Sequence, residues 1–91
     1  VNRNDRTHAA WLFTILVDNR YDLQNKLKAV GIESNQMHFR NDRYSIFKEH
    51  CNDEVFPNMD EVENKYLVLP LHYKLSEEDV RRVCLELKNG W

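Results

Sequence analysis

The apolar run at residues 11–17 (WLFTILV) constrains the fold of this chain more than any other part of its sequence. The run is rich in β-branched and aromatic residues and almost continuous in apolar character, which is typical of a strand buried on both faces or placed centrally in a sheet. A second strand-like run occupies residues 66–71 (YLVLPL). Because Pro70 cannot donate to a β-ladder, this second strand is expected to end at a sheet edge or just beyond it.

Two stretches have the residue spacing of amphipathic helices that could cover such a sheet. In the first stretch, Leu23, Leu27 and Val30 fall at positions i, i+4 and i+7. The polar residues at 18–19, just before it, can accept hydrogen bonds from the free amides of a helix start. Gly31 closes this helix, because glycine adopts the left-handed cap conformation at little cost.

The second stretch is a helix near the end of the chain. Ser76 and Asp79 form an S-x-x-D capping box at its start, and the residues at 89–90 terminate it. Its apolar stripe consists of Val80, Val83, Cys84 and Leu87. We therefore expect this stripe to pack in the core, with Cys84 as a small core residue and not as a reactive thiol.

The segments between these elements are less regular. Residues 32–39 alternate loosely enough to form another strand, whereas the charges, aromatics and turn formers at 40–57 predict a long loop. A short helix capped by Asn58, with Glu61 three residues later, is expected to end near Tyr66.

The expected order is therefore strand, helix, strand, loop, helix, strand, helix. A small, mostly antiparallel sheet with helices packed on one face satisfies this order and defines an α+β fold. Ninety-one residues, 42% of them hydrophobic, suffice for one core but not for two, so we expect a single domain over residues 1–91. The longest apolar stretch, at 9–17, is far shorter than the roughly 20 residues of a membrane-spanning helix, so we expect no membrane span.

Composition argues against several classes of function. A formal net charge of -2 argues against a general nucleic-acid-binding protein, because phosphate-driven affinity requires a basic surface. With only two glycines, the chain has no glycine-rich phosphate loop. Cys51 and Cys84 are the only cysteines and lack metal-binding or redox spacing, so we expect free thiols, no metal site and a cytoplasmic location.

The densest polar cluster lies at residues 38–50 (HFRNDRYSIFKEH). Arg40 and Arg43 within it could hold a phosphate through paired hydrogen bonds. The alternative is that both arginines pair with acidic residues of the same solvated loop, Asp42 and Glu49. The sequence alone leaves both interpretations open.

Two histidines have equally open interpretations. His38 follows an apolar segment, where it could face a cleft or could be a hydrogen-bonded histidine at a strand end. His72 could reach the same cleft, but its position after the run at 66–71 favours a surface turn.

Four segments, taken in order, resemble the C-terminal part of the DegT/StrS family of pyridoxal-phosphate-dependent sugar aminotransferases. They are WLFTILVDNR (11–20), LKAVGIES (27–34), HFRNDRYSIF (38–47) and LVLPLHYKLSEEDV (67–80). In that family an aromatic strand ends in a "vD.R" turn, a helix ends in "GI.s", a strand ends in histidine plus an aromatic residue, and "LsLPlh..Lt.edv" precedes the last helix. The resemblance covers essentially the whole chain and is carried by the order and spacing of these motifs.

The resemblance implies a small domain like that of fold-type I aminotransferases, accompanied by a large upstream domain that supplies the cofactor lysine and most contacts to pyridoxal phosphate. None of those motifs occurs in this chain. Alone, it is therefore expected to contain no catalytic residue, to bind no cofactor and not to transaminate. The full-length enzyme is expected to be a homodimer that moves an amino group from an amino acid, glutamate being the expected donor, to a keto-sugar nucleotide.

The same resemblance implies where the substrate lies. His38 and Phe39 match the histidine and aromatic residue that approach the sugar nucleotide in the family. Asn41 and Arg43 stand where relatives often have a proline and a second histidine, so the identity of the sugar stays open. Arg43 and Arg40 are hypothesised to meet a phosphate or a sugar substituent.

A second hypothesis is a stand-alone α+β binding or regulatory module without catalysis. The polar start of the chain (VNRNDRTH), which lacks an initiator methionine, leads us to expect further sequence upstream and therefore favours the enzyme.

Overall fold

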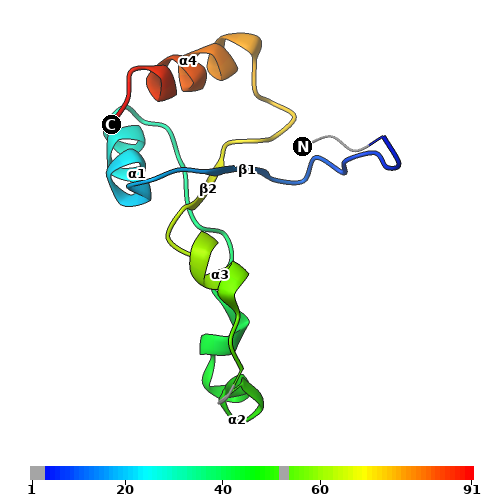
Figure 1. Cartoon of the computed structure of the whole chain (residues 1–91). Helices are drawn as coiled ribbons and strands as arrows, with labels where there is room; N and C mark the ends of the chain where they lie inside the picture. Colours follow the sequence, from blue (N-terminus) through cyan, green and yellow to red (C-terminus); the bar gives the residue numbers. More distant parts are fainter. Residues whose placement is uncertain (1–3, 52–53) are drawn as a thin grey trace.

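The computed structural model describes residues 4–51 and 54–91, whose arrangement is shown in Figure 1. Its strands are β1 (Phe13–Leu16) and β2 (Tyr66–Leu69), and its helices are α1 (Arg20–Ala29), α2 (Lys48–Cys51), α3 (Pro57–Val62) and α4 (Glu77–Lys88). Two 3₁₀ turns, η1 (Asn41–Arg43) and η2 (Ser45–Phe47), precede α2. The expected α+β class with an antiparallel sheet is confirmed. No helix in the described residues is long and apolar enough to cross a membrane.

The sheet consists of β1 paired antiparallel with β2, in a register that places Phe13 opposite Leu69. The strand expected at residues 32–39 is reduced to a single bridge between Asn35 and Val68. The backbone at Met37 has a φ of 38°, in the left-handed region, which ends the extended conformation that a longer ladder requires.

The core lies between one face of the sheet and the two longer helices. Its buried apolar members are Leu23, Leu27, Ile32, Leu67 and Leu69, and its partly buried members are Ile15, Val17, Val30, Val83 and Leu87. Leu23 and Leu27 come from α1, Leu67 from β2, and all three are fully buried. Complete burial of such a side chain stabilises the fold by roughly 1.5–3 kcal/mol.

Strand β1 is not buried on both faces, so that expectation is wrong for this chain. Trp11 just before the strand is 70% exposed, and Phe13 and Leu16 within it are 55% and 61% exposed. In the part of the chain that the structure describes, β2 is the only strand paired with β1. The apolar run therefore forms one wall of the core and an uncovered apolar surface.

The C-terminal helix α4 is attached to α1 through the ends of both helices. The expected capping box is confirmed, since the Ser76 hydroxyl accepts from the Asp79 amide and the Asp79 carboxylate accepts from the Ser76 amide. Lys26 of α1 donates to the carbonyl of Gly90 at 2.6 Å. The Trp91 indole donates to the Asp18 carbonyl at 3.0 Å. These bonds satisfy carbonyls that helix ends and loops leave open.

Three details of the expected helices differ in the structure. Val80 and Cys84 of the expected stripe are exposed instead of buried, because α4 meets the core through a narrow stripe around Val83 and Leu87. Asn19 does precede α1, but in a left-handed conformation without a side-chain cap. Helix α3 starts with a proline at its first turn, where the missing amide costs nothing, and Asn58 is inside it instead of capping it.

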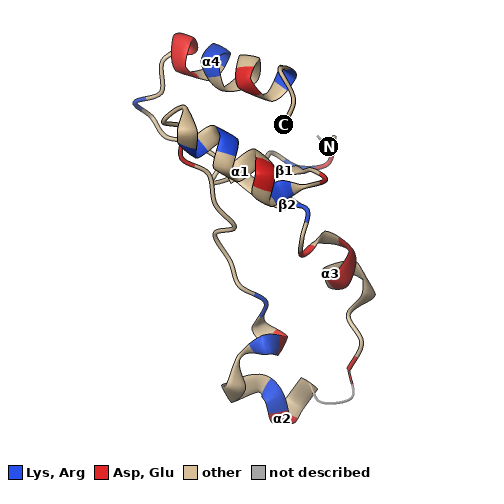
Figure 2. Cartoon of the chain, turned by 90° about the vertical axis from the view of Figure 1, so that its left-hand side faces the viewer, with Lys and Arg blue, Asp and Glu red and all other residues tan. Residues whose placement is uncertain are grey.

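A segment leaves the sheet after Gln36 and returns at Lys65, and its described residues, 37–51 and 54–64, are called the arm. In Figures 1 and 2 the arm extends away from the body formed by α1, α4 and the sheet. The loop expected at 40–57 is thus built from short helical turns, and α3 ends before β2 begins. Arg40 is the only buried residue among those described in the arm.

Arg20 connects the body to the base of the arm. Its side chain is 2% exposed, lies 4.5 Å from the ring of Tyr21, and places Nη1 3.4 Å from the Glu63 carbonyl and 3.5 Å from the Tyr66 carbonyl. Among the described residues no carboxylate forms an ion pair with it. Carbonyl oxygens therefore provide the hydrogen bonds to this buried cation.

Candidate functional site

His38 lies at the junction of the body and the arm, and two side chains fix the backbone around it. The Tyr66 hydroxyl, at the start of β2, is within hydrogen-bonding distance of the carbonyls of Gln36 and His38. The Asn35 side chain accepts from the amide of Met37 at 2.7 Å. Because Asn35 is also bridged to β2, the position of His38 is set by the sheet.

Met37 adopts a conformation that L-residues rarely use. A positive φ in a non-glycine residue costs on the order of 1–3 kcal/mol and persists only where the surrounding contacts impose it. The contacts of Asn35 and Tyr66 provide that restraint. The consequence is a sharp change of direction that takes His38 and Phe39 out of the sheet and into the arm.

The imidazole of His38 lies beside the indole of Trp11. Their ring centroids are 5.9 Å apart and the ring planes are inclined by 58°. Trp11 was not among the residues predicted for the site, because nothing in the local pattern links a residue before β1 to one 27 positions later. Its only sequence signal is its place at the start of the apolar run.

Phe39, the second predicted residue, forms an aromatic pair on the arm. Its ring meets that of Tyr44 edge to face, with centroids 5.2 Å apart and an interplanar angle of 77°. Edge-to-face contacts of this kind are favourable because the positive edge of one ring meets the negative face of the other. Both rings remain exposed to solvent.

Arg40 is 5% exposed and is surrounded by three carboxylates, an arrangement we call the Arg40 hub. Its Nε and Nη2 donate to the two oxygens of Asp42 at 2.9 and 2.8 Å. Its Nη1 lies 2.5 Å from an oxygen of Asp60 and 3.1 Å from one of Glu63. Pairing with Asp42 is the local alternative that the sequence offered, whereas Asp60 and Glu63 come from the returning side of the arm.

The hub shifts the pKa values of two of its members, Asp42 and Arg40. Hydrogen bonds from the Arg40 guanidinium hold the pKa of Asp42 below its usual range. Reciprocally, the bonds to Asp42 and Asp60 raise the pKa of Arg40. Both groups are therefore charged at neutral pH, and the hub joins the two sides of the arm as an ion-pair network.

Arg43 has a different setting from that of Arg40. Its Nη2 donates to Glu63 at 2.6 Å, while 51% of its side chain stays exposed. The structure thus brings His38, Phe39, Arg40 and Arg43 together at the base of the arm, with one arginine enclosed by carboxylates and the other facing solvent.

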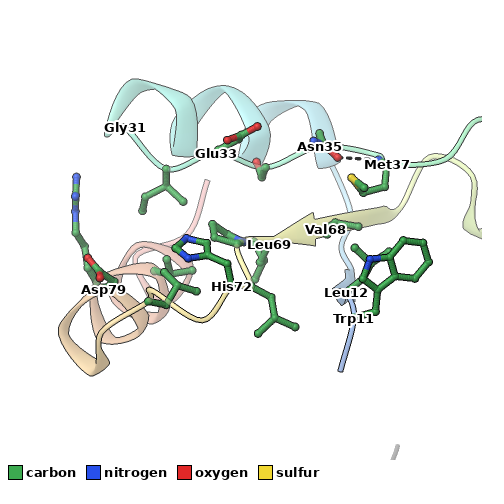
Figure 3. A pocket seen from close by; sticks show the side chains of 17 residues that line it. Trp11, Leu12, Gly31, Glu33, Asn35, Met37, Val68, Leu69, His72 and Asp79 are labelled. Atoms are coloured by element: carbon green, nitrogen blue, oxygen red, sulfur yellow. Dashed lines mark hydrogen bonds between the residues drawn. The ribbon is translucent and has the colours of Figure 1, made fainter. Parts of the chain in front are cut away.

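Two cavities meet at this junction. The first, of about 600 Å³, lies between α4, β2 and the segment after α1, and is drawn in Figure 3. The second, of about 920 Å³, lies along the arm and is lined by residues that include His38, Phe39 and Arg40. Met37 lines both cavities, and Trp11 lines the first.

The remaining candidates, His72 and Cys51, lie apart from each other. His72 begins a turn, in which its carbonyl accepts from the Leu75 amide at 3.1 Å, and it lines the first cavity instead of the His38 cavity. Cys51 is half-buried against the second cavity. In the described part of the chain, no group of three or more His, Cys, Asp or Glu residues is placed to hold a metal ion.

Comparison with known proteins connects this geometry to a family. The model described as the DegT/DnrJ/EryC1/StrS aminotransferase family matches residues 1–88. The chain is similar to the sugar aminotransferase CalS13 from Micromonospora echinospora (TM-score 0.92, 26% identity) and to AtS13 from Actinomadura melliaura (TM-score 0.91, 26% identity). Each match covers 100% of this chain but only 24% of the solved chain. No curated protein matches the sequence.

Proposed function

This chain belongs to the DegT/DnrJ/EryC1/StrS aminotransferase family, and from that premise we propose that it is the small C-terminal domain of a pyridoxal-phosphate-dependent sugar aminotransferase. The whole enzyme transfers an amino group from an amino acid, glutamate being the proposed donor, to a keto-sugar nucleotide. This domain forms one wall of the substrate cleft. The observation that carries the proposal is the gathering of His38, Phe39 and Arg40 on the lining of the cavity of about 920 Å³, with Arg43 held nearby by its ion pair to Glu63.

The described residues do not themselves fit pyridoxal phosphate. No lysine lines either of the two cavities at the junction. Lys26 is engaged by the carbonyls of Glu86 and Gly90, and Lys65 lies 3.9 Å from an oxygen of Asp18. We therefore place the cofactor, and the bond-making steps, in the rest of the polypeptide.

The amount of exposed surface supports a missing partner. The chain has 7815 Å² of accessible surface, whereas a folded protein of 11.0 kDa normally has about 5,600 Å². Its radius of gyration is 16.0 Å, compared with about 12 Å for a compact domain of this length. We propose that the large domain, and a second copy in a homodimer, cover the excess.

Within the cleft each residue has a separate role. The imidazole of His38 can donate to or accept from a sugar hydroxyl, and Phe39 with Tyr44 forms an apolar wall that excludes water. Arg43 is assigned to binding a phosphate or an acidic sugar substituent, because half of its side chain is accessible. Arg40 acts as a positioning residue, since carboxylates already surround its guanidinium.

Kinetics of the complete polypeptide test the proposal. His38→Ala and Arg43→Ala are expected to raise the KM for the keto-sugar nucleotide and to leave the KM for the amino donor unchanged. Arg81→Ala is the matched control, because Arg81 is exposed on α4 and its one ion pair among the described residues is with Glu77. Unchanged sugar-nucleotide KM values in both site variants would remove the proposal.

The cellular setting is part of the same proposal. Cys51 and Cys84 are both free thiols. Free thiols suit a reducing compartment, which supports a cytoplasmic enzyme that draws on cytoplasmic sugar nucleotides.

A further inference from the structure

Trp11 is the large aromatic side chain at the junction whose role the family motifs leave open. At 70% exposure most of its indole faces solvent, although indole is among the most apolar surfaces a protein can display. Exposure alone carries no argument, because single surface hydrophobics are common. What distinguishes Trp11 is its surroundings.

One neighbour of Trp11, His38, belongs to the proposed substrate wall. Its ring contacts the imidazole of His38, and it lines the first cavity together with Met37, the residue shared by both cavities. Figure 3 shows the indole at the end of that cavity, beside Leu12 and near Val68 of β2. Phe13 and Leu16, the exposed apolar residues of β1, have no such polar ring beside them in the described part of the chain.

The two rings form a corner with complementary chemistry. The ring planes are inclined by 58°. The indole offers an apolar face, whereas the imidazole nitrogens can form hydrogen bonds. A pyranose matches such a corner, since its C–H faces are apolar while its hydroxyl groups point outward around the rim. A sugar seated on the indole would direct rim hydroxyls at His38.

We propose that Trp11 is the platform on which the sugar ring of the substrate stacks, with its contact to His38 setting the orientation of that ring. This inference rests on the proposed function, because it assumes that His38 faces a sugar nucleotide. It adds a specificity-determining residue that lies on a different element from His38. It also gives a reason for an exposed indole at a position where a smaller side chain would expose less apolar surface to water.

Binding to the complete, cofactor-loaded polypeptide tests the inference. UDP-, dTDP- and GDP-glucose are titrated by calorimetry, and the tightest ligand is compared with its own nucleoside diphosphate. Trp11→Ala is expected to weaken binding of the sugar nucleotide by about tenfold and to leave binding of the diphosphate unchanged. Trp11→Phe should recover most of the loss, because it keeps an aromatic face.

Matched variants separate the possible outcomes. Tyr73→Ala, which removes an aromatic side chain that is 92% exposed and lines none of these cavities, should change neither affinity. Equal losses for the sugar nucleotide and the diphosphate would mean that Trp11 stacks on the base. A lower melting temperature with unchanged affinities would mean that Trp11 packs against the rest of the polypeptide. Either result overturns the inference.

His38→Ala shows which proposal has failed. If His38→Ala weakens sugar-nucleotide binding and Trp11→Ala does not, only the platform is wrong. If neither variant has an effect, or if none of the three probes binds the wild-type protein, the substrate wall itself is wrong.

Discussion

The body and the arm of this chain are held together by different forces. The body is stabilised by leucines of α1 and β2 that exclude water from one small core. The arm has no buried apolar residue among those described, and its two sides are joined instead by the Arg40 hub. Apolar burial is indifferent to pH and strengthened by many salts, whereas an ion-pair network depends on charge. The two regions should therefore respond to different perturbations.

The largest expected effect is a loss of stability in the body. Leu27→Ala should lower the free energy of unfolding by about 2–5 kcal/mol, because it leaves a cavity beside β2 in a core with few members. Urea unfolding followed by circular dichroism measures the change. Leu85→Ala, on the exposed side of α4, is the matched control and should be nearly neutral. A loss for Leu27→Ala no larger than that of the control would contradict a core centred on α1.

The next effect is confined to the arm. Arg40→Met removes the cation shared by Asp42, Asp60 and Glu63 and leaves their charges close together, so the two sides of the arm should separate. Amide hydrogen exchange should accelerate across the arm and stay unchanged in α1. Arg40→Lys should restore slow exchange in the arm only in part, because lysine cannot form the bidentate hydrogen bonds to Asp42. Equal acceleration in the arm and in α1 would show that the hub also supports the body.

The smallest effect is a difference in acid sensitivity. Because Arg40 lowers the pKa of Asp42 from its usual 3.8, the stabilisation it provides is complete above that value and is lost as the pH falls through the lowered one. In NMR titrations from about pH 6 to about pH 2, amide shifts around Asp42 should therefore change mainly below pH 3.8, whereas those of the apolar core of α1 should change less. Asp42→Asn should remove part of this response. Simultaneous changes in both regions would argue against separate stabilisation.

Several patterns that depend on nearby residues were predicted correctly, although the helix caps expected at Asn19 and Asn58 were not. Positions of β1, β2, α1 and α4 follow from apolar spacing, and the Ser76–Asp79 box involves residues three apart. The strand predicted at residues 32–39 is not formed, although the residue alternation that suggested it is present. The backbone turns at Met37, where contacts from Asn35 and Tyr66 determine the conformation.

Most features of the site that could not be predicted from the sequence depend on contacts between residues far apart in the chain. The candidate residues His38 to Arg43 were found from motif order, but the partners of Arg40 on the far side of the arm are 20 and 23 positions away. Contact between Trp11 and His38 likewise requires the fold to be known. The exposure of β1 was missed because an apolar run looks the same whether its cover belongs to this chain or to another part of the polypeptide.

Strand β2 has a mechanical consequence for the proposed sugar-binding corner formed by Trp11 and His38. Its first residue, Tyr66, is bonded to the backbone around His38, and its last, Leu69, pairs with Phe13, two residues from Trp11. Both walls of the corner are thus fastened to the same short strand, whose central side chains form the core. If this domain rotates about a hinge to open or close the cleft, the indole and the imidazole move together as one rigid unit. Their mutual angle would then be preserved through the whole movement, so the orientation of the sugar would be set before closure begins.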